Sequence, residues 1–287
     1  MVTCGSYARR EASAESDLDY FVIVPNFIQS GKQAETASEP AWLQVARSVT
    51  GNVVPAAPAT GGAFEWMESP DTMLSNIGGD GDSNAKFTRR MLFLLEGEWL
   101  SNEAEFNSVR RQILERYIRP GMADHQLARF LLNDIIRYYR TMAVDYEFKT
   151  VEGDAPKPWG IRNIKLVFSR KLLYASGLFS IAMTVDHARE RKIGVLERLF
   201  QMPVMDRMID ICGLAEMGPV LESYEQFLLR LENKAVRKHL AGLQPDERDN
   251  PMFRELKNEG HHFTGELMRL FERTFDSTHP IRRAIVF

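Results

Sequence analysis

The chain begins with the stretch VTCGSYARREASAESDLDYFVIV, residues 2–24, which decides the fold expected for its N-terminal part. The segment Tyr20 to Val24 is aromatic or β-branched, which is typical of a β-strand. Val2 to Cys4 read as the end of another strand, and Gly5-Ser6 as a tight turn into a short helix. Residues 2–24 therefore predict the order strand, turn and helix, strand.

Asp17 and Asp19 are separated by one residue at the start of the second strand. Because strand side chains alternate between two faces, both carboxylates are expected on the same face. Backbone N–H groups at a glycine turn such as Gly5-Ser6 bind phosphate well, and paired carboxylates bind Mg²⁺. The stretch therefore indicates a Mg²⁺–nucleotide site, whereas an Asp-x-Asp pair alone would more simply be two acids facing water.

This combination resembles the DNA polymerase β-type nucleotidyltransferase superfamily, whose signature is Gly-Ser, a short segment, and Asp-x-Asp flanked by apolar residues. The matching residues here are Gly5, Ser6, Asp17 and Asp19. The segment 9–19 looks most like the uridylyltransferase-like and related bacterial branches. The resemblance covers residues 2–24. Members usually carry a helix ahead of the strand that ends in Gly-Ser, and residues 1–4 do not supply it.

The resemblance implies that Asp17 and Asp19 hold two Mg²⁺ ions and that a third carboxylate on a neighbouring strand helps to activate the attacking hydroxyl. Glu65 is the first choice for that third acid, because it lies in the apolar segment 63–66. An exposed strand acid is the simpler interpretation of Glu65. Further candidates for the third carboxylate are Glu68, Asp71, Asp80 and Asp82.

Phosphate binding is expected from the N-terminal stretch and from a later helix. Gly5 and Ser6 would cradle phosphates, and of the adjacent arginines Arg9 is expected to point at the triphosphate. In this superfamily a lysine and a serine on a later helix often hold the β- and γ-phosphates, and Lys165 and Ser169 match by type and spacing. With Arg162 they step by three and four residues, the spacing of one helix face, which could equally be a solvated surface.

The composition is that of an ordinary soluble globular protein with 44% hydrophobic and 26% charged residues. A chain of 287 residues most plausibly forms two domains. The net charge of −3 offers no global basic field, so a long nucleic acid is an unlikely partner. Two cysteines suit a reducing cytoplasm, and the nearly uncharged run 172–185 is too short to span a bilayer.

Helical periodicity dominates after residue 84. Helices are expected at residues 41–47, 86–96, 103–117, 128–148, 161–182, 187–200, 204–212, 218–241 and 251–275, and a strand is expected to open at 52–55. Leu131, Ile135, Tyr138 and Met142 illustrate the helical spacing. The predicted architecture is an α/β nucleotidyltransferase-like domain with a small mixed sheet over residues 1–100, followed by an all-α domain over residues 101–287.

The expected function is transfer of a nucleoside monophosphate from a Mg-NTP, with ATP the first choice, to a hydroxyl of a protein or small-molecule acceptor. Pyrophosphate would be released, and the metal charge would supply much of the rate. Two other functions remain open: a non-catalytic nucleotide sensor that lacks the third acid, and an antitoxin-like module whose helix 161–182 binds a partner chain. The six histidines form no metal signature, and no Walker-type loop is present.

Overall fold

The fold is that of a computed structural model, which describes residues 1–24, 41–54, 67–152 and 157–286. The chain divides into two compact units, Met1–Arg116 and Tyr117–Phe287. The expected boundary after residue 100 therefore precedes the helix α5 (Glu103–Tyr117), nearly all of which belongs to the first unit. Each unit is described by itself below.

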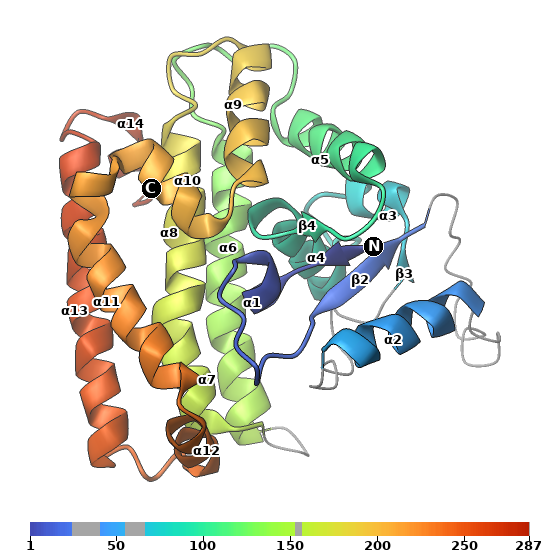
Figure 1. The fold of residues 1–287 in the computed structure, drawn as a ribbon. Coiled ribbons are helices and arrows are strands. Elements are labelled where there is room, and N and C mark those ends of the chain that lie inside the picture. Colours follow the sequence, from blue (N-terminus) through green and yellow to red (C-terminus); the bar gives the residue numbers. More distant parts are fainter. Residues whose placement is uncertain (25–40, 55–66, 153–156, 287) are drawn as a thin grey trace. The chain divides into compact units, whose positions relative to one another are not determined.

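The first unit contains a small mixed sheet with the strand order β3-β2-β1-β4. Strand β1 (Val2–Thr3) pairs antiparallel with both β2 (Tyr20–Ile23) and β4 (Glu98–Trp99), and β2 pairs parallel with β3 (Met67–Glu68). Figure 1 shows β1 running directly into α1, with β2 alongside. The expected order strand, helix, strand over residues 2–24 is present.

Helices account for most of the other described residues of this unit. The described ones are α1 (Gly5–Ala8), α2 (Ala41–Val53), α3 (Pro70–Leu74), α4 (Asn84–Leu95) and α5 (Glu103–Tyr117). Helix α3 begins where Ser69 Oγ accepts a hydrogen bond from Thr72 N, with Pro70 in the first turn. Helix α4 begins in the same way at Ser83, whose hydroxyl accepts from Lys86 N. Local capping therefore fixes both helix starts.

The strand expected at residues 52–55 was wrong, because α2 continues through Val53. Extending a helix that has already formed adds one hydrogen bond per residue, so a short β-branched pair does not stop it. The helix ends before Val54, which precedes Pro55, and the residue before a proline avoids helical geometry.

Two neighbouring arginines of α4 form ion pairs inside the first unit. Arg90 is fully buried, and its guanidinium donates to Asp82 Oδ1 at 3.1 Å and to Asp82 Oδ2 at 2.8 Å. Arg89, which is 5% exposed, pairs with Glu68 of β3, itself 3% exposed. Buried arginine needs such partners, because a guanidinium stays charged at any ordinary pH. These pairs connect α4 to β3 and to the loop before α4.

The second unit is all helical in its described part. Its helices are α6 (Arg129–Glu147), α7 (Trp159–Lys165), α8 (Lys171–Ala182), α9 (Arg189–Gln201), α10 (Val204–Cys212), α11 (Leu214–Glu232), α12 (Lys234–Gly242), α13 (Pro251–Thr274) and α14 (Pro280–Ala284), with π-helical turns η2 (Phe148–Glu152) and η3 (Leu166–Arg170). Figure 1 shows α11 and α13 side by side. Phe168 stacks on Phe227 with ring centroids 4.4 Å apart, which joins η3 to α11 in the core.

Two helices expected as single elements are divided. The helix expected at 161–182 is present as α7 and α8 joined by the π turn η3, which inserts extra backbone into the helical register. The helix expected at 218–241 breaks at Asn233, whose side chain accepts hydrogen bonds from Ala235 N and Val236 N and so caps α12.

Lys192 of α9 is a buried cation at the end of the second unit where α6, α8 and α9 begin or end. Its side chain is inaccessible to solvent, and Nζ donates to the carbonyl oxygens of Asp124, Gln126 and Thr184 at 2.6–2.8 Å. Burial lowers the pKa of Lys192, while the charges of Asp124 and Asp186 act in the opposite direction. One ammonium group therefore satisfies carbonyls from two connecting segments.

Among the helices of the described residues, none is long and apolar enough to cross a bilayer.

Candidate metal and nucleotide site

The structure brings Gly5 and Asp19 into direct contact. Gly5 has a φ of +71°, and a Cβ atom at this position would lie 2.9 Å from Asp19 Oδ2. The backbone holds the two together, because Cys4 N donates to Asp19 O at 2.9 Å and the Thr3 hydroxyl donates to the same oxygen at 3.0 Å. The left-handed backbone and the close carboxylate both require glycine here.

Asp17 and Asp19 alternate with apolar residues that face the core. Leu18 and Tyr20 are 8% and 1% exposed and belong to one apolar cluster, whereas Asp17 and Asp19 are only partly buried. The alternation places both carboxylates on the face away from that cluster, as the period of two predicts. Both carboxylates therefore lie on the partly exposed side of the stretch, with Asp19 Oδ1 itself buried.

Helix α1 follows Gly5 at once and is only four residues long. Its second residue, Ser6, is partly exposed, and Ser6 O accepts a hydrogen bond from Glu11 N at 2.8 Å. Cys4, at the N-cap position, makes no side-chain capping hydrogen bond. At this turn the Ser6 residue is therefore partly exposed, while the backbone of Gly5 lies close to the Asp19 carboxylate.

Arg9 does not lie as expected for a triphosphate ligand. It is 8% exposed, its Nε donates to Glu11 Oε2 at 2.9 Å, and its Nη1 pairs with the buried carboxylate of Glu96. A guanidinium placed between two carboxylates is already neutralised, and it ties α1 to the end of α4. The exposed neighbour is Arg10, whose guanidinium lies 3.7 Å from Glu98.

Glu96 is the residue near this site that sequence reasoning missed. Its side chain is inaccessible to solvent although it is an acid that directly follows the apolar last turn of α4. The available signal was that position, since Glu96 directly follows the buried run Met91 to Leu95. A buried acid there needs a cation, and Arg9 supplies it.

Four of the five candidates for the third carboxylate lie among the described residues. Glu65, the first choice, lies outside the described residues. Glu68 and Asp82 are buried against Arg89 and Arg90, so neither is placed as an open metal ligand, while Asp71 and Asp80 are exposed. Within the described residues, no group of three or more His, Cys, Asp or Glu side chains is placed to hold one metal ion.

Lys165 and Ser169 belong to the helical unit and do not share an exposed face. Lys165 ends α7 and is exposed, whereas Ser169 lies in the π turn η3 and is 5% exposed. The Tyr224 hydroxyl donates to Ser169 Oγ at 3.1 Å. The π turn between the two residues alters the 3.6-residue register on which the shared face was predicted.

Gly5→Ala is expected to destabilise the first unit by about 1–2 kcal/mol, the cost of a non-glycine residue in the left-handed region plus displacement of Asp19. Ser6→Ala is the matched control, because it removes a partly exposed hydroxyl and leaves the backbone unrestrained. Urea unfolding of both variants measures the difference. Equal stability of Gly5→Ala and the unsubstituted chain would contradict the close contact.

Comparison of the chain with protein-family models, with curated proteins and with solved structures gave no match.

Proposed function

We propose that the chain is a metal-dependent nucleotidyltransferase, which transfers a nucleoside monophosphate from a Mg-NTP, first of all ATP, to a hydroxyl group of a protein or small-molecule acceptor. Pyrophosphate is the second product. The substrate site lies in the first unit, on the face that carries Asp17, Asp19 and the Gly5-Ser6 turn.

The contact between Gly5 and Asp19 carries this proposal. A backbone turn that bends into the left-handed region at Gly5 lies so close to the Asp19 carboxylate that a Cβ atom at residue 5 would be 2.9 Å from Asp19 Oδ2. Phosphate oxygens bound at the turn would thus be neighbours of the carboxylate, and a divalent cation can bridge the two. Two solvent-exposed acids with no function would not require a glycine with positive φ beside them.

Each group then has a defined role in the reaction. Asp17 and Asp19 would hold Mg²⁺, whose positive charge would offset the negative charge of the triphosphate. The turn at Gly5 and Ser6 orients the phosphate chain. The acceptor oxygen attacks the α-phosphorus and loses its proton, while the bond from the α-phosphorus to the bridging oxygen of pyrophosphate breaks. Glu65 remains the sequence-based prediction for the group that accepts the proton.

The binding test uses the double variant Asp17→Asn with Asp19→Asn. In the unsubstituted chain, Mg-ATP at a hundred times its dissociation constant should stabilise the fold by about 2.7 kcal/mol, and ATP with EDTA should not. The double variant should lose this stabilisation, because amide groups do not replace carboxylates as Mg²⁺ ligands. Thermal melts with ATP, GTP, CTP and UTP measure it and identify the preferred base.

The control for this test is Glu15→Gln, which removes an exposed carboxylate just before the pair. It should keep the full response to Mg-ATP. Without ligand, the double variant should be as stable as the unsubstituted chain or slightly more so, because two neighbouring carboxylates repel each other when no metal is bound. An equal thermal shift in EDTA, or unfolding of the double variant, would overturn the metal site.

A pyrophosphate-release assay separates the transferase from the nucleotide sensor. A transferase should release pyrophosphate from the preferred Mg-NTP when a hydroxyl acceptor is supplied, and Glu65→Gln should slow that release while leaving the thermal shift intact. Mg-NTP binding without pyrophosphate release from any acceptor would favour the sensor.

A further inference from the structure

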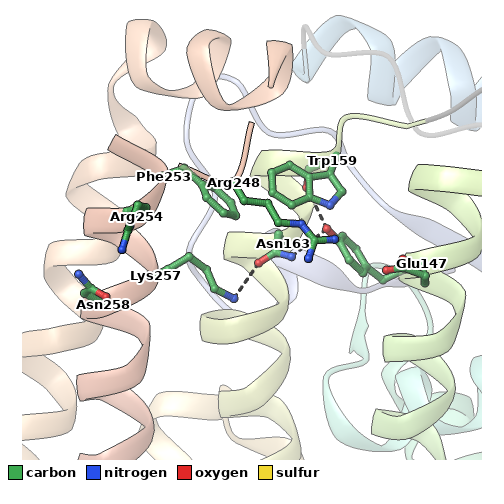
Figure 2. A pocket seen from close by; sticks show the side chains of 9 residues that line it. Glu147, Trp159, Asn163, Arg248, Phe253, Arg254, Lys257 and Asn258 are labelled. Carbon is green, nitrogen blue, oxygen red and sulfur yellow. Dashed lines mark hydrogen bonds between the residues drawn. The ribbon is translucent and has the colours of Figure 1, made fainter. Parts of the chain in front are cut away.

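The helical unit contains a separate cavity of about 400 Å³, well away in sequence from the Asp17–Asp19 site. It lies among the end of α6, the start of α7, the segment before α13 and the first turns of α13. Figure 2 shows Arg248 and Lys257 reaching toward Asn163 from different segments, with Trp159 and Phe253 beside them. None of these residues belongs to the proposed transferase site.

A chain of hydrogen bonds fixes the polar side of the cavity. Lys257 Nζ donates to Asn163 Oδ1 at 2.9 Å, and Asn163 Nδ2 donates to the Tyr146 hydroxyl at 2.8 Å. The Tyr146 hydroxyl in turn donates to Trp159 O at 3.4 Å. An ammonium has three N–H donors, and one of them is used by Asn163. Lys257 therefore keeps donor capacity for a ligand in the cavity.

The charge of the lining is predominantly positive. Among the described residues, neither Arg248 nor Lys257 forms an ion pair with a carboxylate; Arg248 Nε donates only to the carbonyl of Pro245, at 3.1 Å. Arg254 is held by Asp249 at 3.1 Å. Glu147, which is exposed, is the single carboxylate among the lining residues. Two cations thus line the cavity without a carboxylate at ion-pair distance among the described residues.

A third cation strengthens this field. Lys171 of α8 is near enough to Lys257 for the Lys257 charge to lower its pKa, after the larger effect of burial. Burial also lowers the pKa of Lys257. Lys171 Nζ donates to the Thr264 hydroxyl at 2.6 Å, and it too has no carboxylate partner among the described residues. An anion placed beside Lys257 would relieve this repulsion.

The other side of the cavity is aromatic, with the rings of Trp159 and Phe253 tilted by 37° to each other. Trp159 and Phe253 are 5% and 4% exposed, and their ring centroids lie 4.6 Å apart. The backbone beside Trp159 packs closely on α12, because a Cβ atom at the next residue, Gly160, would lie 2.5 Å from Leu240 O. Preformed aromatic walls with a few convergent polar groups are characteristic of small-molecule sites.

We propose that this cavity binds a small organic phosphomonoester that carries a flat ring. The doubly charged phosphate lies against Lys257 and Arg248 and accepts hydrogen bonds from both, and the ring packs against the aromatic side of the cavity. A dianion is the favoured head group because it matches two cations that lack carboxylate partners, whereas a monoanion would leave one of them uncompensated.

Phenyl phosphate is the probe that combines both features, and isothermal titration of the full chain measures its binding. Lys257→Gln and Arg248→Gln should each weaken binding tenfold to a hundredfold, the range of one charge-assisted phosphate contact. Lys238→Gln is the matched control, because it removes an exposed cation from α12 of the same unit, outside the cavity. It should leave the affinity unchanged.

Two further probes test separately whether the ring and the double negative charge of the ligand contribute to binding. Inorganic phosphate should bind at least tenfold more weakly than phenyl phosphate, because it lacks the ring, and benzoate should also bind more weakly, because it carries one charge. The double variant Asp17→Asn with Asp19→Asn should bind phenyl phosphate normally. The proposal would be overturned if the chain did not bind phenyl phosphate, or if Lys257→Gln and Arg248→Gln bound it as tightly as the unsubstituted chain. It would also be overturned if benzoate bound as tightly as phenyl phosphate, or if the Asp17 and Asp19 variant lost phenyl phosphate binding. Arg248 is exposed, so its variant tests the site even if Lys257→Gln perturbs the fold.

Discussion

Asp82→Ala is expected to lower the free energy of unfolding of the first unit by about 3–5 kcal/mol, the usual cost of removing one partner from a buried ion pair. Arg90 is fully buried, and Asp82 accepts two hydrogen bonds from its guanidinium. Asp82 Oδ2 also accepts from Gly78 N at 3.0 Å. After the substitution, Arg90 keeps its charge and loses both hydrogen bonds to this carboxylate, while Nη1 also donates to Met73 O at 3.4 Å.

Urea unfolding measures the free energy of unfolding of the first unit. Two further variants show how much of its decrease is due to the buried ion pair. Asp80→Ala removes an exposed acid from the same loop, so its effect should stay within about 0.5 kcal/mol. Asp82→Ala combined with Arg90→Met removes both charges and should recover most of the stability. Similar stabilities for Asp82→Ala and Asp80→Ala would mean that the buried pair contributes little.

Glu68→Ala is expected to have an effect of the same size, about 3–5 kcal/mol, since it leaves Arg89 buried without its carboxylate. Glu68 Oε1 also accepts from Ser69 N at 3.3 Å, just before α3 begins. Asp71→Ala is the matched control, because Asp71 is exposed in the first turn of α3 and contributes through the helix dipole about 0.3–1 kcal/mol. Urea unfolding measures both.

Substitution at Glu68 can also show whether this acid has a structural or a catalytic role. Glu68→Met combined with Arg89→Met removes the pair and keeps apolar volume in its place, so the fold should recover. If Glu68 only holds Arg89, this double variant should still respond to Mg-ATP and release pyrophosphate. A folded double variant that binds Mg-ATP but no longer releases pyrophosphate would show instead that Glu68 is the third carboxylate.

Local patterns predicted the N-terminal stretch well. Burial alternates along residues 17–20 as expected: Leu18 and Tyr20 are buried, and Asp17 and Asp19 are partly exposed. This pattern was predictable because strand periodicity depends only on neighbouring residues. The turn at Gly5 has the positive φ that glycine permits. The long helical region was also expected, since helical spacing is a local property and is clear over many residues.

Features that depend on distant partners were not predictable in the same way. Arg9 looked like a phosphate ligand because its own segment does not reveal Glu96, with which it pairs. Ser169 was expected to share one helix face with Lys165 and to contact phosphate, because nothing nearby in sequence signals either the π turn η3 or the hydroxyl of Tyr224. In both cases the deciding contact joins residues that are more than fifty positions apart. The cavity around Lys257 has the same origin, because its lining comes from separate segments.

Lys192 shows how a protein can use the charged side chain of its own lysine where a bound metal ion could otherwise lie. Its ammonium group is surrounded by three carbonyl oxygens, an arrangement that resembles the oxygen shell of a metal ion. A metal at this position would be lost by dissociation and removed by a chelator, whereas the lysine is permanently attached to α9. Order in the connections around Asp124 and Thr184 is therefore independent of ion supply, even if the proposed chemistry of the first unit requires Mg²⁺.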